Sequence, residues 1–159
     1  MAKVIERKHR LSENLYIGTI RVSFTLCIKD RIPIFQNKDV VLSLIAILKE
    51  TIEKFLCKNW IYVFMPDHLH YILEGSSQDS NLMASTEIFK QRSGYWFSKN
   101  GKGAQWQKDY YDHIHRKEED IIRQLFYIAN NPVRKSLCKK WDEYPFVGSI
   151  HYDLHKLIR

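Results

Sequence analysis

Two strand-like segments separated by only two residues constrain this chain more than any other feature of its sequence. Residues 59–65 (NWIYVFM) and 68–74 (HLHYILE) are rich in β-branched and aromatic side chains, which favour strands. Pro66 and Asp67 between them are typical turn residues. A connection this short joins neighbouring antiparallel strands, so the sequence predicts a β-hairpin in the middle of the chain.

Further periodic segments lie on both sides of this hairpin. Before it, residues 17–28 alternate as in a strand, and apolar residues recur at helical spacing in 38–56. After it come a helical pattern in 81–99, a strand pattern in 106–115 and a helical pattern in 117–130, and the remaining tail gives no clear pattern. The order predicts an α+β fold, a ferredoxin-like split β-α-β sandwich with a four-stranded antiparallel sheet and two helices on one face. The third helix is expected on the other face.

Length and composition agree with a single folded unit. The chain has 159 residues, of which 45% are hydrophobic, and no repeat or linker divides it, so we expect one domain over 1–159 with a core of about 10–150. Its three cysteines lack CxxC spacing and have apolar neighbours, as core thiols in a reducing compartment do. No signal-peptide pattern and no apolar run of about 20 residues occur, so we expect a cytoplasmic protein without a membrane partner.

The charge balance favours a polyanionic partner. Lys and Arg outnumber Asp and Glu by 25 to 18, which gives a formal net charge of +7. Nucleic acid and an anionic membrane surface are the two partner classes that such a charge attracts. The basic residues are dispersed along the chain, as they also are on an ordinary solvated surface, so charge alone does not select a function.

The second strand of the hairpin opens with a His-x-His pair. Residues two apart in a strand point to the same face, so His68 and His70 should project together while Leu69 points toward the two covering helices. Two neighbouring imidazoles are candidate metal ligands. His113 and His115 repeat the spacing, however, so spacing alone does not distinguish a metal site from surface histidines. The first pair directly follows a turn and opens an apolar strand, which favours it.

The last predicted helix carries a tyrosine on its polar side. An arc of about 160° on a helical wheel holds the expected buried residues, Ile121, Ile122, Leu125, Phe126, Ile128 and Ala129. Tyr127 lies opposite this arc, together with Gln124 and, if the helix extends that far, Asn131. It can be an ordinary surface tyrosine, or its hydroxyl can serve as a nucleophile on a phosphodiester that a metal ion polarises.

Five blocks of the sequence carry a family resemblance. MPDHLHYIL, which contains His68 and His70, resembles the His-hydrophobic-His block of the HUH single-tyrosine transposases. KQRSGYWF, WQKDYYDHIHRKEED, YIANNPVRKSL and W-DEYPFVGSI resemble, in order, later blocks of the REP-associated tyrosine transposase branch. The resemblance extends from about residue 10 to 150, and the ordered set is far more specific than a His-x-His pair.

The resemblance implies roles for individual residues. His68, His70 and Asn131 correspond to the metal ligands, and Tyr127 corresponds to the nucleophile. Related insertion-sequence enzymes tend to carry Gln where this chain has Asn131. His115 stands where the branch usually has an apolar residue, so we expect the second pair to be incidental. The implied cofactor is a divalent metal, Mg²⁺ or Mn²⁺.

The function implied by the resemblance is strand transfer on DNA. Such an enzyme nicks and rejoins single-stranded DNA at hairpins formed by palindromic repeats, through a 5′-phosphotyrosine intermediate. Both a monomer and a homodimer are compatible with it. Two alternatives remain open at this point: a domesticated protein that binds DNA hairpins without cleaving them, and a metal phosphohydrolase that uses water.

Overall fold

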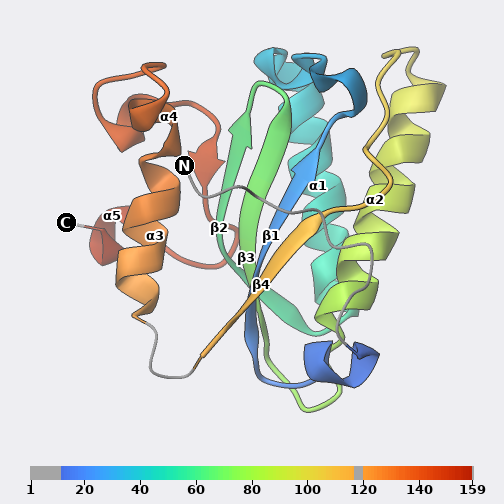
Figure 1. The fold of residues 1–159 in the computed structure, drawn as a ribbon, viewed down its shortest axis with the longest axis vertical. Helices are drawn as coiled ribbons and strands as arrows, with labels where there is room; N and C mark the ends of the chain where they lie inside the picture. The colour runs from blue at the N-terminus through green and yellow to red at the C-terminus, as the bar shows by residue number, and fades with distance from the viewer. Residues whose placement is uncertain (1–11, 117–119, 159) are drawn as a thin grey trace.

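A five-stranded antiparallel sheet forms the centre of the computed structural model, which describes residues 12–116 and 120–158 (Figure 1). The strands are β1 (Arg21–Cys27), β2 (Cys57–Met65), β3 (His68–Gly75), β4 (Tyr111–His115) and β5 (Val147–Gly148). Their order across the sheet is β4-β1-β3-β2-β5. The predicted four-stranded sheet was therefore one strand short. The edge strand β5 has only two residues, too few to give a strand pattern in the tail.

Two helices cover one face of the sheet, as predicted: α1 (Lys38–Lys54) and α2 (Leu82–Lys99) (Figure 1). Each begins at an asparagine whose side chain accepts hydrogen bonds from backbone N–H groups of the first turn, Asn37 for α1 and Asn81 for α2. The main core lies between these helices and the sheet. Its members include Phe24, Leu26, Leu69 and Tyr71 from the strands and Leu44, Leu48 and Phe89 from the helices.

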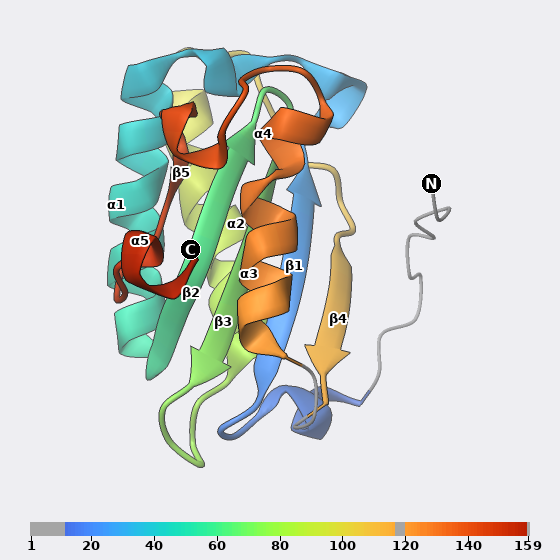
Figure 2. The ribbon, with the colours of Figure 1, turned by 90° about the vertical axis from the view of Figure 1, so that its left-hand side faces the viewer.

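The opposite face carries α3 (Ile121–Ala129), as predicted, with the C-terminal segment beside it (Figure 2). A second, smaller core lies here; it contains Ile61, Val63, Met65, Ile72, Leu125, Ala129, Leu154 and Ile158. The short helices α4 (Asn131–Arg134) and α5 (Leu154–Leu157) follow α3. Four single turns of 3-10 helix complete the described elements: Glu13–Tyr16, Lys29–Arg31, Ile34–Gln36 and Trp141–Glu143.

Two predicted elements are shorter than expected. The strand predicted over 106–115 pairs as β4 only from Tyr111, and Trp106 forms a single isolated bridge with Ile28 because its ring packs among core aromatics. The helix predicted from residue 117 is described from Ile121, with Asp120 as its N-cap. Residues 117–119 lie outside the described part of the chain.

The apolar arc predicted for α3 is only partly buried. Leu125 and Ala129 are fully buried, whereas Ile122 is 38% and Phe126 is 52% exposed, so the expectation was wrong for these two residues. The sheet contact of α3 is a stripe along β2, which is narrower than the apolar arc. Tyr127 is 61% exposed, as its place opposite the arc predicts.

The three cysteines are free thiols; Cys27 and Cys57 are buried as expected, but Cys138 is only half-buried. Among residues 12–116 and 120–158, no helix has the length and apolar character that crossing a membrane requires.

Candidate metal and nucleophile site

His68 and His70 project from one face of the sheet, as their spacing predicts. They lie opposite Met65 and Val63 of β2, which face α3 in the smaller core, while Leu69 points into the main core. The two imidazole centroids are 4.7 Å apart, with ring planes at 88°. Both rings are therefore presented together on the α3 side, at the start of β3.

Each imidazole is held through its Nδ1 atom. His68 Nδ1 lies 2.6 Å from Asp67 Oδ1, and His70 Nδ1 lies 2.8 Å from Thr25 Oγ1. The other oxygen of Asp67 accepts a hydrogen bond from Arg31 Nε at 2.9 Å. An ionised carboxylate only accepts hydrogen bonds, so His68 carries its proton on Nδ1 and keeps the Nε2 lone pair for another partner.

The electrostatics keep both imidazoles neutral at physiological pH. Burial, with the charges of Arg134 and Arg31, lowers the pKa of His70 to about 3. Burial also lowers the pKa of His68, against the opposing effect of Asp67. Burial alone would raise the pKa of Asp67, but the hydrogen bonds from His68 and Arg31 and the charge of Arg31 outweigh it, so this carboxyl stays ionised. Neutral imidazole is the form that binds metal ions.

Asn131 and Tyr127 are tied together by a residue that the sequence pattern did not single out. The guanidinium of Arg134 donates to the Tyr127 carbonyl oxygen at 2.7 Å and to Asn131 Oδ1 at 3.3 Å. Its central carbon lies 3.9 Å from the centroid of the Tyr127 ring, which is a cation–π contact. Arg134 thus links the predicted nucleophile with the predicted amide ligand.

The histidine pair and this α3–α4 cluster lie at the same end of the sheet. Helix α4 lies beside the β2–β3 turn (Figures 1 and 2). The positive charge of Arg134 in α4 contributes to the lowered pKa of His70, and that of Lys135, directly after α4, contributes to the lowered pKa of His68. The charges at α4 therefore act on both imidazoles. Within the described residues, however, no hydrogen bond or ring contact joins either histidine directly to Tyr127 or Asn131.

The side chains at this end of the sheet can hold a divalent cation only if an amide oxygen is one of the ligands. Among the described residues, no three His, Cys, Asp or Glu side chains gather in a group that could hold a metal ion. Two neutral imidazoles at the start of β3 and the Asn131 oxygen on α4 are the donors that this end of the sheet offers. Imidazole and carbonyl oxygen together are compatible with Mn²⁺ and, less favourably, with Mg²⁺.

The second histidine pair lies on the same face but elsewhere along it. His113 and His115 of β4 stand opposite Ser23 and Arg21 of β1, and their ring centroids are 4.8 Å apart. His115 Nε2 lies within hydrogen-bonding distance of Ser23 Oγ, at 2.5 Å. Expecting this pair to be incidental remains a prediction.

The residues that support the candidate site were missed for identifiable reasons. Asp67 was interpreted only as a turn residue, although a carboxylate directly before a ligand histidine is itself a signal. Arg134 lies three residues after Asn131 in the same sequence block. Thr25 and Arg31 come from a distant segment and reach the histidines only through the pairing of β1 with β3.

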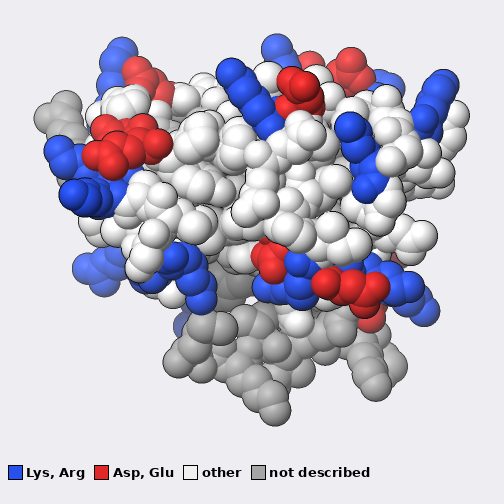
Figure 3. All heavy atoms as spheres, turned by 90° about the horizontal axis from the view of Figure 1, so that it is seen from above, with Lys and Arg blue, Asp and Glu red and all other residues white. Residues whose placement is uncertain are grey.

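Seen from above, Lys and Arg side chains are spread around the rim of this end, with acidic side chains among them, and the middle is mostly uncharged (Figure 3). Arg134, Lys135, Lys139 and Lys140 are all exposed. Three aromatic residues of the later sequence blocks contribute to packing: Tyr110 is buried, and Trp106 and Trp96 pack against the main core.

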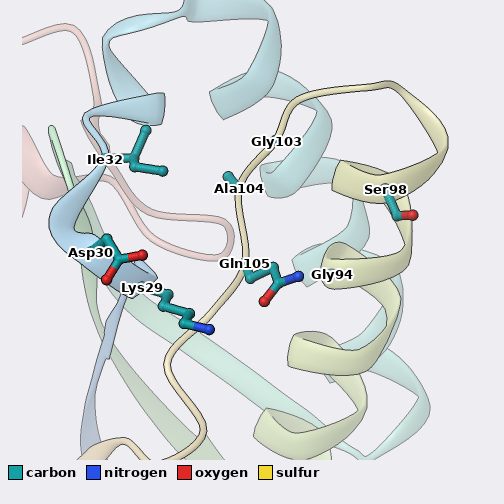
Figure 4. A pocket seen from close by; sticks show the side chains of 8 residues that line it. All are labelled: Lys29, Asp30, Ile32, Gly94, Ser98, Gly103, Ala104 and Gln105. Carbon is teal, nitrogen blue, oxygen red and sulfur yellow. The ribbon is translucent and has the colours of Figure 1, made fainter.

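A separate hollow of about 540 Å³ lies between the segment after β1 and helix α2 (Figure 4). Its walls are formed by Lys29, Asp30, Ile32, Gly94, Ser98, Gly103, Ala104 and Gln105. None of the four predicted site residues lines it, so the hollow is not the site of the predicted chemistry.

Comparisons with known proteins agree with the resemblance found in the sequence. The family profile described as IS200-like transposase matches residues 17–131. A Haemophilus influenzae protein named as a REP-associated tyrosine transposase is 24% identical over 142 residues, which cover 82% of this chain and 80% of that protein. A second Haemophilus influenzae protein, of uncharacterised function, is 32% identical over 94 residues, 45% of this chain and 52% of that one.

Two solved structures share the fold. One is a REP-associated tyrosine transposase bound to a REP hairpin; it is 20% identical, with a TM-score of 0.77, and the match covers 96% of this chain and 88% of that one. The other is a crystal structure assigned as a transposase from Deinococcus radiodurans, also 20% identical, with a TM-score of 0.54 and coverage of 78% and 96%.

Proposed function

The chain belongs to the IS200-like transposase family, and on that premise we propose that it nicks and rejoins single-stranded DNA at hairpins formed by palindromic repeats. The observation that carries this proposal is the cluster at one end of the sheet. There, two neutral imidazoles lie at the same end of the sheet as helix α4, where Arg134 links Asn131 with the exposed Tyr127. The name of the Haemophilus relative and the hairpin bound to the structural neighbour support hairpin DNA as the substrate.

His68, His70 and Asn131 would hold a divalent metal, Mg²⁺ or Mn²⁺. When bound, the metal polarises the scissile phosphate and offsets the charge that develops on it. The protein prepares this site by keeping both imidazoles neutral and by fixing the His68 proton on Nδ1.

Tyr127 is the proposed nucleophile. Its hydroxyl oxygen attacks the phosphorus and loses its proton to solvent, while the bond from phosphorus to the 3′ oxygen breaks and that oxygen takes up a proton. The products are a 5′-phosphotyrosine and a free 3′-OH. The covalent bond conserves the energy of the phosphodiester, so a 3′-OH can attack it later and rejoin the strand without ATP.

Basic side chains near the nucleophile would hold the DNA backbone. Arg134 already contacts the Tyr127 ring, and its guanidinium is a good partner for phosphate oxygens. Lys135, Lys139 and Lys140 continue the positive surface away from it. A strand lying along this surface would pass the Tyr127 hydroxyl.

A hairpin oligonucleotide with single-stranded flanks, taken from a palindrome near the gene, tests the proposal. The protein should form an adduct that survives denaturing electrophoresis when Mn²⁺ or Mg²⁺ is present, and none when EDTA is added. An unstructured oligonucleotide of the same composition is the matched control and should give much less adduct. Cleavage without an adduct would instead indicate a metal phosphohydrolase that uses water.

A hairpin-binding protein without cleavage activity is the second candidate. The hairpin bound to the structural neighbour fits this candidate as well, since binding a hairpin does not require cleaving it. It predicts tight, selective hairpin binding with neither a nick nor an adduct under any metal condition.

A further inference from the structure

The segment that follows β1 has an unusual backbone. Asp30 and Arg31 have φ angles of 61° and 54°, in the left-handed region that residues other than glycine seldom adopt. Conformations of this kind persist only where the surrounding structure holds them in place. The contacts that hold this segment therefore indicate what it is for.

Two of those contacts are made to Asp67, and a third joins the Lys29 backbone N–H to the Gln105 carbonyl oxygen at 2.8 Å. The backbone N–H of Ile28 donates to the Asp67 carbonyl oxygen at 2.9 Å, and Arg31 Nε donates to Asp67 Oδ2 at 2.9 Å. The turn between β2 and β3 is thus bonded to the segment after β1 through both the main chain and a side chain.

Asp67 passes this restraint on to His68. Its two carboxylate oxygens have different partners: Oδ2 accepts from Arg31, and Oδ1 accepts from His68 Nδ1 at 2.6 Å. A guanidinium has no acceptor, and a carboxylate paired with it is ionised, so the carboxylate accepts at both oxygens. His68 consequently keeps its proton on Nδ1 and its lone pair on Nε2.

The partner of His70 is different in kind. Thr25 Oγ1 is a hydroxyl, which can donate to the imidazole or accept from it, and so does not by itself fix the tautomer. Of the two histidines, only His68 has a partner that dictates its proton position. The strained, left-handed backbone at Asp30 and Arg31 lies in the segment that supports this partner, Asp67.

We propose that Arg31 and Asp67 are a positioning pair that sets the tautomer and ring orientation of His68 for metal binding. This inference rests on the proposed function, because it assumes that His68 is a metal ligand. Arg31 acts on Asp67, Asp67 acts on His68, and neither touches the DNA or the metal. Carboxylates that orient ligand histidines in this way typically change metal affinity by about 10- to 100-fold when they are removed.

The first test uses metal-free protein and histidine ¹⁵N chemical shifts, which distinguish a protonated ring nitrogen from an unprotonated one. In the parent protein, His68 should be a single tautomer with the proton on Nδ1. Asp67→Ala should shift it toward a mixture of tautomers, and Asp67→Asn, which keeps one acceptor oxygen but has a donor in place of the other, should restore the parent signal only in part. A His68 signal that is unchanged in Asp67→Ala would overturn the proposal.

The second test is Mn²⁺ binding measured by calorimetry without DNA. Asp67→Ala should lose about 10- to 100-fold in affinity, and Arg31→Ala should lose several-fold. Lys29→Ala is the matched control: it removes a positive charge from the same segment, but its side chain lines the hollow of Figure 4 instead of bonding Asp67. An Arg31→Ala variant that binds Mn²⁺ like the Lys29→Ala variant would remove Arg31 from the pair.

The two proposals can fail separately. A parent protein that binds no Mn²⁺ would refute the metal assignment in the proposed function, and the chemical shifts would still decide whether Asp67 sets the His68 tautomer. Conversely, strong Mn²⁺ binding that is within about twofold of parent in Asp67→Ala would leave the metal site intact and refute the positioning pair.

Discussion

The chain contains two His-x-His pairs that are almost the same locally and differ in what surrounds them. His68 and His70 have ring centroids 4.7 Å apart, and His113 and His115 have ring centroids 4.8 Å apart. Thr25 of β1 pairs with both His70 and Tyr111, so the two pairs also project from the same face of the sheet. Local geometry therefore does not distinguish them.

The two histidine pairs differ in their positions along the sheet. Opposite β1, the first pair stands at Cys27 and Thr25 and the second at Ser23 and Arg21, a displacement of four residues or about 13 Å along the strand. The displacement takes the second pair away from the β2–β3 turn, which is the end where α4 lies (Figure 2). The first pair has Asp67 beside it and lies near the charges of Arg134 and Lys135.

The spacing of two histidines therefore determines that they share one face of the sheet, whereas segments distant in sequence determine which partners their rings have. For His68 and His70 those segments are the turn after β1 and the helix after α3.

Replacing a histidine of each pair should give the largest contrast. His70→Ala should reduce metal-dependent nicking by more than about 100-fold, since loss of a ligand should exceed the cost of losing its supporting residue. His113→Ala, the matched change in the second pair, should leave nicking within a few-fold of parent. Single-turnover nicking of a hairpin oligonucleotide measures both, and equal losses in the two variants would abolish the distinction between the pairs.

We expect the next largest effect, on the rate of adduct formation, from replacing Arg134. Arg134→Ala removes the contacts to the Tyr127 carbonyl and to Asn131 and the charge beside the nucleophile, so adduct formation should slow by about 10- to 100-fold. Arg123→Ala, a similarly exposed arginine on α3, is the control and should slow it little. Arg134→Lys keeps the charge but not the fork of donors, and should recover only part of the rate.

The stability of the protein should depend on pH through His70. Its pKa in the folded state, about 3, lies below the ordinary value of 6.5, so the unfolded state binds more protons between these values. The contribution to the free energy of unfolding is therefore fully present above pH 6.5 and is lost as pH falls toward 3. His70→Gln should flatten this part of the pH profile in urea unfolding; an unchanged profile would contradict the burial of a neutral His70.

The smallest effect concerns DNA affinity. Lys135→Ala, beside the first pair, should lower the slope of log Kd against log salt concentration by about 0.7–0.9, the value of one phosphate contact. Lys54→Ala, an exposed lysine at the end of α1 on the other face, should leave the slope unchanged. Fluorescence anisotropy with a labelled hairpin at several salt concentrations measures both slopes.

The sequence predicted the parts of the fold that depend on local pattern. The hairpin, the helices on both faces and the common face of His68 and His70 follow from periodicity and turn residues alone. The edge strand β5 was missed because Val147 and Gly148 pair with β2 without any strand pattern of their own. The exposure of Phe126 was missed because a helical wheel shows which side is apolar, but not how wide a stripe the sheet contacts.

The candidate site was also predicted only in part. Tyr127 and Asn131 came from helical position and family resemblance, and the structure places Tyr127 opposite the packed side of α3, as expected. Thr25, Arg31 and Arg134 act through contacts that depend on strand register and on the short helix after α3. Such contacts join segments that are far apart in sequence, or segments that leave the regular helix. A local sequence pattern does not predict them.

The central claim is that Tyr127, beside the first histidine pair, is the nucleophile. Tyr111 is the sharpest rival, because it lies on the same face of the sheet as His70, with only β1 between their two strands. The decisive measurement is the yield of the covalent protein–DNA adduct from a hairpin oligonucleotide with Mn²⁺, compared between Tyr127→Phe and Tyr111→Phe. The account predicts no adduct from Tyr127→Phe, undiminished hairpin binding in that variant, and a near-parent yield from Tyr111→Phe. An adduct that persists in Tyr127→Phe and disappears in Tyr111→Phe would contradict it.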